Sequence, residues 1–251
     1  MASIMITGAS SGIGKALALE YAEQGTILFL CARRKERLEE TASKCQKKGA
    51  TVYTRCLDVT DEKAMKEWIA EAESMSCLDI VIANAGISAG TGSLDGESEA
   101  KTREIFAINL GGVMNTVLPL IPIFQKRKCG QIILISSLAG YRGVPGAPAY
   151  SGSKGAVRIW GEALRGWLKS YGIKVSVVCP GFVESEITAK NKFPMPGLMK
   201  ADKAAGIIRS GAGRNKPRIT FPFYMAFISW LMMALPVAVS DFIYSRLPLK
   251  E

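Results

Sequence analysis

The chain has 251 residues, 48% of them hydrophobic, and a formal net charge of +10. This length suits one large α/β domain, and the apolar content excludes an intrinsically disordered protein. Because no histidine is present, a metal site built on histidine is excluded. The six cysteines form no C-x-x-C pair, so we expect reduced thiols, no metal and a cytoplasmic location.

The positive charge is spread over segments such as 33–37, 126–128 and 190–192, without interleaved aromatic residues. We therefore expect a solvated basic surface that attracts phosphate cofactors or anionic lipid, and no nucleic-acid ligand. No basic stretch followed by an apolar core precedes the first strand-like run, so we expect no secretory signal.

Short apolar runs alternate with longer helical patterns along the chain. This alternation predicts a single doubly wound Rossmann-type domain with a mainly parallel sheet of about seven strands. The sequence locates strands at Ser3–Thr7, Thr26–Ala32, Thr51–Leu57, Asp79–Ala83, Gln131–Ser136 and Lys174–Cys179. It locates helices at Ile13–Glu23, Lys35–Lys48, Glu62–Met75, Lys101–Gln125 and Ser151–Tyr171.

A glycine-rich turn, G-x-x-x-G-x-G, links the first predicted strand to the first helix. Glycines at these positions permit a tight turn and a close approach of a pyrophosphate to backbone N–H groups at a helix N-terminus. Alone the turn is a weak signal, but its place in the chain predicts a dinucleotide site. The candidate cofactor-binding residues are Gly8, Ser10, Ser11, Gly12, Ile13 and Gly14.

The second strand ends in Arg33 and Arg34, where an NAD site usually has an acidic residue for the ribose 2′-hydroxyl. Basic residues there suit a 2′-phosphate. We therefore expect NADP(H) as the cofactor. The alternative is that the two arginines only begin an exposed helix.

Tyr150 and Lys154 lie four residues apart, which places them on one face of a helix, one turn apart. A tyrosine with a pKa near 10 is a poor proton carrier at neutral pH. A lysine charge about 4 Å away would contribute about 4 kcal/mol at an effective dielectric constant near 20, enough to bring the phenol pKa towards 7. We expect Lys154 to lower the pKa of Tyr150.

With these motifs the sequence, from Ser3 to Ser185, resembles the short-chain dehydrogenase/reductase family. Residues 7–14 match its T-G-x-x-x-G-x-G turn, and Asp58 and Val59 match its adenine-contacting segment. Asn84, Ala85 and Gly86 resemble its N-N-A-G turn, with Ala83 in place of the first asparagine. Asn109 matches the helix asparagine, and the spacing to the tyrosine selects Ser137 over Ser136. The segment with Pro180, Gly181, Val183 and Ser185 resembles the part that contacts the nicotinamide amide, with Ser185 in place of threonine.

The resemblance implies a catalytic set of Asn109, Ser137, Tyr150 and Lys154. Ser137 would hydrogen-bond the substrate oxygen, Tyr150 would donate the proton in reduction, and Lys154 would also bind the nicotinamide ribose. The backbone of Asn109 would anchor a water molecule that links Lys154 to solvent. The resemblance also implies a homodimer or homotetramer, paired through the 101–125 and 151–171 helices.

Beyond residue 185 the resemblance thins, and we divide the chain into a core (1–185), a substrate lid region (186–215) and an apolar C-terminal helical extension (219–251). Met195, Leu198 and Met199 favour an apolar lid. Residues 219–240 carry no charge, but Pro222 and Pro236 argue against a spanning helix. The segment would pack against the cleft and a partner subunit, or lie peripherally on the inner face of a membrane.

The sequence thus predicts an NADP(H)-dependent oxidoreductase that interconverts a ketone or aldehyde and an alcohol on a hydrophobic lipid-, steroid- or retinoid-like substrate. The alternative from another class is a non-catalytic NADP-binding regulatory or membrane-peripheral protein. The complete set of four catalytic candidates favours the enzyme.

Overall fold

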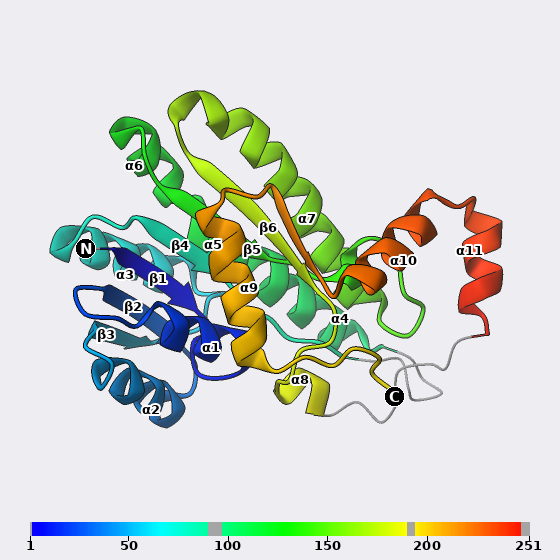
Figure 1. Ribbon diagram of the computed structural model, residues 1–251, viewed down its shortest axis with the longest axis horizontal. Coiled ribbons are helices and arrows are strands. Elements are labelled where there is room, and N and C mark those ends of the chain that lie inside the picture. The colour runs from blue at the N-terminus through cyan, green and yellow to red at the C-terminus, as the bar shows by residue number, and fades with distance from the viewer. Residues whose placement is uncertain (1, 90–96, 190–193, 247–251) are drawn as a thin grey trace.

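The computed structural model describes residues 2–89, 97–189 and 194–246. Its strands are all parallel and form one sheet in the order β3-β2-β1-β4-β5-β6-β7 (Figure 1). The predicted doubly wound α/β fold is confirmed. The strands are β1 (Ser3–Thr7), β2 (Ile27–Ala32), β3 (Thr51–Cys56), β4 (Ile80–Ala83), β5 (Gln131–Ile135), β6 (Lys174–Pro180) and β7 (Arg218–Phe221).

Helices cover both faces of the sheet, which is why its central strands are continuously apolar. Buried side chains of α1, α2 and α9 pack on one face, and those of α3, α5, α6 and α7 pack on the other. The helices are α1 (Gly12–Tyr21), α2 (Lys35–Gln46), α3 (Glu62–Met75), α4 (Glu99–Phe106), α5 (Gly112–Val117), α6 (Leu120–Arg127), α7 (Pro148–Leu168), α8 (Glu186–Ala189), α9 (Ala201–Gly213), α10 (Phe223–Ala234) and α11 (Val237–Tyr244).

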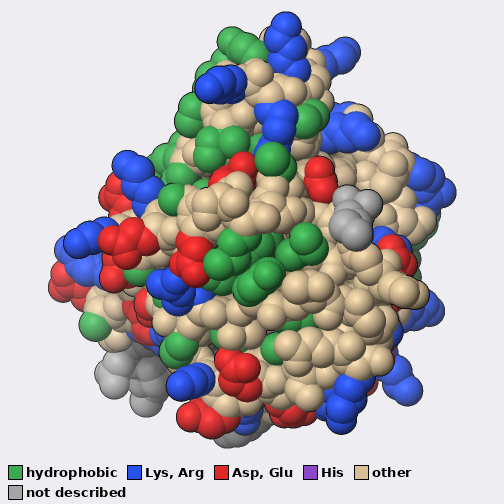
Figure 2. All heavy atoms as spheres, turned by 90° about the vertical axis from the view of Figure 1, so that its left-hand side faces the viewer, with side chains coloured by type: hydrophobic (Ala, Val, Ile, Leu, Met, Phe, Trp, Pro, Cys, Tyr) green, Lys and Arg blue, Asp and Glu red, His purple; other side chains and the backbone are tan. Residues whose placement is uncertain are grey.

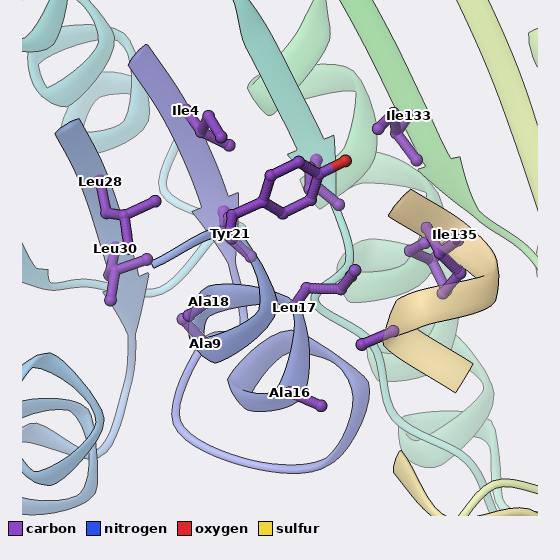
Figure 3. Close-up of a cluster of buried hydrophobic side chains, with 14 of the residues drawn as sticks. Ile4, Ala9, Ala16, Leu17, Ala18, Tyr21, Leu28, Leu30, Ile133 and Ile135 are labelled. Atoms are coloured by element: carbon purple, nitrogen blue, oxygen red, sulfur yellow. The ribbon is translucent and has the colours of Figure 1, made fainter. Parts of the chain in front are cut away.

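The core beneath α1 shows how the first helix is held against the sheet (Figure 3). Leu17 and Tyr21 lie one helical turn apart and point to the same apolar cluster as Ile4, Leu30 and Ile135. Burial of each such side chain contributes about 1.5–3 kcal/mol. This packing anchors the helix whose N-terminus follows the glycine turn.

The single helix predicted at Lys101–Gln125 is wrong in detail. The chain passes through α4, a π-helical turn η1 (Ala107–Gly111), α5 and then α6. Pro119 lies just before α6 and lacks the N–H that would continue the hydrogen bonding of α5. By length and composition the run Glu99–Arg127 could cross a membrane, but half of its apolar window is buried in the protein.

The predicted boundaries after residue 185 also need correction. Residues 201–213 form α9, which packs against α1 and contributes Ala204 and Ile208 to the core, so the lid region cannot extend to 215. Ile219 and Phe221 are buried in β7, the seventh strand of the sheet. The apolar extension therefore begins after β7, not at 219. This strand could not be predicted from the sequence, because it is short and lies at the start of a longer apolar run.

The extension folds as α10 and α11, which lie at the opposite end of the molecule from α2 and β3 (Figure 1). Met225 and Ala226 of α10 pack against Leu138 and Tyr141, close to the end of β5. Arg142 donates a hydrogen bond of 2.6 Å to Ser240 of α11. On the face shown in Figure 2, Lys and Arg side chains are interspersed with Asp and Glu rather than gathered in one patch.

Candidate active site

The main cleft opens at the carboxyl ends of β1 and β4, where the strand order reverses. In open α/β sheets this switch point is where ligands bind. The cleft has a volume of about 440 Å³. Its walls include all the predicted cofactor residues except Gly14, and three of the four predicted catalytic residues: Ser137, Tyr150 and Lys154.

The glycine turn lies against Asn84 and Ala85, the residues that follow β4. Gly8 and Gly12 have φ of +68° and +51°, a conformation that favours glycine. Gly14 does not line the cleft: a Cβ there would lie 2.3 Å from the Gly8 carbonyl oxygen and 2.4 Å from Asn84 Nδ2. Its role is to let α1 approach the turn closely. A Cβ at Gly12 would lie 3.0 Å from Ser185 Cβ, so the turn forms a narrow cradle that suits a pyrophosphate.

Thr7 joins the turn to the residues after β4. Its hydroxyl oxygen accepts hydrogen bonds from the backbone N–H groups of Asn84 and Ala85, at 3.0 and 3.1 Å. The Asn84 side chain in return donates to the Thr7 carbonyl oxygen at 2.9 Å. These bonds hold the two strand ends together, so the floor of the cleft is preorganised.

Two adjacent serines, Ser136 and Ser137, directly follow β5, and the structure gives them different partners. Ser136 borders the cleft, but its buried hydroxyl donates a 2.7 Å hydrogen bond to the Lys154 carbonyl oxygen. Ser137 also lines the cleft; its hydroxyl accepts a 3.1 Å hydrogen bond from the Ala139 N–H and acts to lower the pKa of the Tyr150 phenol. The two hydroxyls that a proton transfer would use therefore belong to the lining of one cleft.

Burial raises the pKa of Tyr150, and the hydrogen bond with Ser137 opposes that rise. This direction is opposite to the lowering expected from Lys154. The Lys154 side chain is buried at 4% exposure and donates a 2.8 Å hydrogen bond to the Ile135 carbonyl oxygen. Burial lowers its own pKa from 10.5 to about 8. Burial is the largest cause of the pKa shift at both groups, and spacing along a helix cannot reveal burial.

Asn109 lies within η1, completely buried behind the cleft wall. Its Oδ1 accepts from the Ile87 N–H at 2.8 Å, and its Nδ2 donates to the Ile87 carbonyl and to Ser153 Oγ, both at 3.0 Å. Ser153 Oγ donates in turn to the Tyr150 carbonyl oxygen at 2.9 Å. A Cβ at Gly86 would lie 3.1 Å from Asn109 Oδ1 and 3.2 Å from Lys154 Nζ, so these elements converge at one point.

Comparisons with known proteins agree with this arrangement. The family model for short chain dehydrogenase matches residues 2–194. This chain belongs to the short-chain dehydrogenase family. It is 37% identical over 244 residues to an uncharacterized oxidoreductase of Myxococcus xanthus, covering 97% of this chain and 96% of the relative. It is 30% identical over 227 residues to 17-beta-hydroxysteroid dehydrogenase 13 of Rattus norvegicus, covering 89% of this chain and 75% of that one.

Solved structures share the fold. A short-chain dehydrogenase from Sphingobium yanoikuyae in complex with NADPH superposes with a TM-score of 0.82 at 24% identity, covering 99% of this chain and 97% of that one. One from Mycobacterium paratuberculosis bound to NAD superposes with a TM-score of 0.77 at 23% identity, covering 87% and 94%. The chain is accordingly an oxidoreductase of a family that uses nicotinamide cofactors.

In this short-chain dehydrogenase the far end of the cleft is rich in charge. Arg33 Nη1 lies 3.6 Å from Asp58 Oδ2. Arg34 Nη2 donates to Ser11 Oγ at 3.0 Å and to Ser10 Oγ at 3.3 Å, and its Nη1 is paired with Glu186. Both arginines line the cleft beside the glycine turn, so they do more than begin an exposed helix.

The segment after β6 forms the opposite wall of the cleft. Gly181 N–H donates to the Phe221 carbonyl oxygen at 2.8 Å, which continues the pairing of β6 with β7. A Cβ at Gly181 would lie 3.2 Å from Met225 Sδ, so α10 packs directly behind this wall. The hydroxyl of Ser185 is held by Thr188, whose Oγ1 also donates to the Val183 carbonyl oxygen at 2.9 Å.

The predicted apolar lid is described only in part, because residues 190–193 lie outside the described residues. Met199 is tied to the wall segment: its N–H donates to the Phe182 carbonyl, and its carbonyl accepts from the Glu184 N–H. None of Met195, Leu198 and Met199 lines the main cleft. Leu198 and Met199 instead border a second hollow beside Pro222.

Sequence reasoning missed several residues that shape the site. Glu186 and Thr188 line the cleft, Arg37 pairs with Glu186, and Ser153 links Asn109 to Tyr150. Each is an ordinary polar residue within a helix or at its start. The only available signal was position, since Glu186 and Thr188 directly follow the Pro180–Ser185 segment.

Proposed function

We propose that this chain is an NADP(H)-dependent oxidoreductase that interconverts a ketone or aldehyde and an alcohol on a hydrophobic substrate. One observation carries the proposal: Ser137, Tyr150 and the buried Lys154 line the same part of one cleft, while Arg33 and Arg34 line its other end. An acid–base group and an anion-binding end in one cleft suit hydride transfer to a carbonyl.

The residues divide the chemistry between them. The bound cofactor supplies or accepts the hydride. Ser137 and Tyr150 hold the substrate oxygen, and Tyr150 gives its proton to that oxygen in reduction. Because burial raises the pKa of Tyr150, the phenol stays protonated at neutral pH, which is the state that reduction needs. The Lys154 ammonium would bind the cofactor ribose. Asn109 ties η1 to Ile87 and to Ser153 behind the cleft wall.

The preference for NADP(H) rests on the arginines after β2. A 2′-phosphate at the end of the adenosine ribose would meet Arg33 and Arg34, together with the hydroxyls of Ser10 and Ser11. Charge-assisted hydrogen bonds of this kind contribute about 1.5–3 kcal/mol each. Among the described residues Asp58 is the one acidic side chain paired with Arg33, and it follows β3 rather than β2.

The apolar character of the substrate rests on the C-terminal helices. Met225 packs behind Gly181, and Ala226 packs against Leu138, one residue after Ser137. The substrate end of the cleft thus adjoins an apolar element with no charged side chain. The similarity to a hydroxysteroid dehydrogenase supports a lipid-, steroid- or retinoid-like substrate.

The test has two steps. Calorimetry with NADPH and NADH should give tighter binding of NADPH by at least about tenfold, equivalent to 1.4 kcal/mol. Turnover of a panel of hydrophobic ketones should then fall by about a hundredfold or more in Tyr150→Phe while NADPH affinity is kept. Equal affinity for the two cofactors would remove the NADP assignment. Binding of NADPH without turnover by the wild type would favour the non-catalytic regulatory protein.

We also propose that the chain is cytoplasmic and contacts an anionic lipid surface through α10. This helix turns one wholly uncharged face to solvent, made of Phe223, Tyr224, Phe227, Ile228, Trp230 and Leu231. Twelve residues span roughly 18 Å, too short to cross a hydrocarbon core of about 30 Å, so the helix would lie in the interface. The net charge of +10 favours anionic lipid.

Point variants test the lipid contact better than truncation at Arg218, which would remove β7 from the sheet. Wild-type protein should float with vesicles that contain phosphatidylglycerol, and the double variant Phe227→Asp/Trp230→Asp should not. Met75→Asp, at an exposed apolar position on α3, is the control. Absence of wild-type flotation would leave α10 with a packing role only.

A homodimer or homotetramer is proposed as well. The helices expected to pair between subunits expose large apolar side chains, including Met114 and Leu118 on the α5 side and Ile159 and Trp167 on α7. Light scattering during size-exclusion chromatography should give the mass of two or four chains. Ile159→Asp should lower that mass, and a wild-type monomer would contradict the proposal.

A further inference from the structure

A carboxylate of the chain already occupies the arginines that would bind the 2′-phosphate of NADP(H). Glu186, the first residue of α8, accepts hydrogen bonds from Arg34 Nη1 at 2.7 and 2.5 Å through its two oxygens. Arg37 is paired with the same carboxylate. The same Arg34 guanidinium also reaches the hydroxyls of the glycine turn, so it connects α8 to that turn.

The local charges leave room for a second anion. Three guanidinium groups, those of Arg33, Arg34 and Arg37, face two carboxylates, those of Asp58 and Glu186. Glu186, Arg34 and the serines of the turn all border the cleft, so this ion cluster is open to a ligand. The pair is solvent-exposed, with 41% of the Arg34 side chain and 45% of the Glu186 side chain accessible. An exposed ion pair is weak enough to be exchanged.

We propose that Glu186 is a specificity-determining residue: its carboxylate pairs with Arg34 and Arg37 until the 2′-phosphate of NADP(H) takes its place. The proposal rests on the proposed preference for NADP(H). A carboxylate with one negative charge occupies the arginines loosely, whereas a phosphate with up to two charges and three acceptor oxygens binds them more strongly. NAD(H), which brings no phosphate, leaves Glu186 in place.

The exchange has a structural consequence for α8. Glu186 directly follows Ser185, whose side chain packs against Gly12. α8 is held by the Ala189 N–H to Ser185 carbonyl hydrogen bond and by Thr188. Displacing the carboxylate removes the ion pairs that tie α8 to α2 and the turn. Binding of the phosphate therefore loosens the segment that leads into the substrate side of the cleft.

The decisive variant is Glu186→Gln, tested with adenosine 2′,5′-bisphosphate and adenosine 5′-monophosphate as probes. Removing the competing carboxylate should tighten binding of the bisphosphate by about three- to fivefold, the size of one exposed ion pair, and leave the monophosphate unchanged. Glu36→Gln is the matched control, because Glu36 lies on α2 between the same arginines and forms no ion pair among the described residues. It measures the general effect of losing one negative charge nearby.

A second measurement uses the wild-type chain. Amide hydrogen exchange at Ala189 should become faster when the bisphosphate binds and should not respond to the monophosphate. In Glu186→Gln it should be fast from the start. The proposal is overturned if Glu186→Gln weakens the bisphosphate, which would mean that the carboxylate helps to hold it, or if Glu36→Gln tightens it equally.

The outcomes also separate this inference from the proposed function. If wild-type protein prefers the bisphosphate but Glu186→Gln changes nothing, Glu186 does not compete and the NADP(H) assignment stands. If the wild type does not distinguish the two probes, the NADP(H) preference itself fails and the exchange at Glu186 fails with it.

Discussion

The buried surroundings of Lys154 disfavour its positive charge. Replacing the lysine should therefore change how the free energy of unfolding depends on pH. Burial lowers the pKa of Lys154 from 10.5 to about 8. Below pH 8 the lysine is protonated in both the folded and the unfolded chain, so folding bears the full cost of burying the charge, about 3 kcal/mol. Between pH 8 and 10.5 the unfolded chain binds more protons, so stability rises with pH.

The variant Lys154→Met removes this dependence. The cost of about 3 kcal/mol at pH 7 falls to about 1 kcal/mol at pH 10, so the wild type should gain about 2 kcal/mol relative to the variant over this range. The hydrogen bond to the Ile135 carbonyl is lost as well, but its contribution shifts both values in the same direction. Turnover should be abolished, since Lys154 also binds the ribose.

Urea denaturation followed by tryptophan fluorescence at pH 7 and pH 10 measures both proteins, and comparison with the wild type cancels the titration of all other groups. Lys63→Met, which removes a side chain that is 87% exposed, is the control. A stability difference between wild type and Lys154→Met that stays constant from pH 7 to pH 10 would refute the argument that burial depresses this pKa.

Three further substitutions probe the site. Gly14→Ala places a Cβ 2.3 Å from the Gly8 carbonyl oxygen, so thermal denaturation should show a loss of about 1–3 kcal/mol and calorimetry a weaker cofactor complex. Asn109→Ala removes both hydrogen bonds to the partly buried N–H and carbonyl of Ile87 and should cost about 1–3 kcal/mol of stability, measured by urea denaturation. Ser137→Ala should lower kcat by about tenfold or more in steady-state assays, and should cost about 1 kcal/mol of stability because its hydroxyl accepts from the Ala139 N–H.

Matched variants make these results specific. Gly166→Ala, at a helix position with open space around it, should be neutral or stabilising by up to about 1 kcal/mol. Ser136→Ala should reduce stability by about 1 kcal/mol, because it removes a buried hydrogen bond, and should leave kcat unchanged. If Ser136→Ala and Ser137→Ala had the same effect on kcat, the assignment of the serines would be wrong. Normal stability in Gly14→Ala or Asn109→Ala would contradict the packing argument.

Local sequence was sufficient for the central sheet and for the order of the motifs. β1 and α3 have the predicted limits, and the other strands before β7 differ from the predictions by a residue or so at their ends. Buried parallel strands are largely apolar, so the central strands were visible by themselves, whereas β3, TVYTRC at the sheet edge, is only partly apolar. β7 was not visible, because an edge strand of four residues inside a longer apolar run has no period that distinguishes it.

For the site, the sequence by itself determined which chemical groups are available: a phenol, an ammonium, a hydroxyl, a glycine turn and two adjacent arginines. The sequence also determined the fold, because a chain in which strands and helices alternate can adopt few arrangements. Only the tertiary structure decided what these groups do to one another. It buried the Lys154 side chain and placed Tyr150 in the same cleft wall, so desolvation shifts the pKa of both groups, and it brought Glu186 to Arg34 across 152 positions of sequence. Desolvation and contacts between distant segments depend on how the chain packs around a group, which no local pattern encodes.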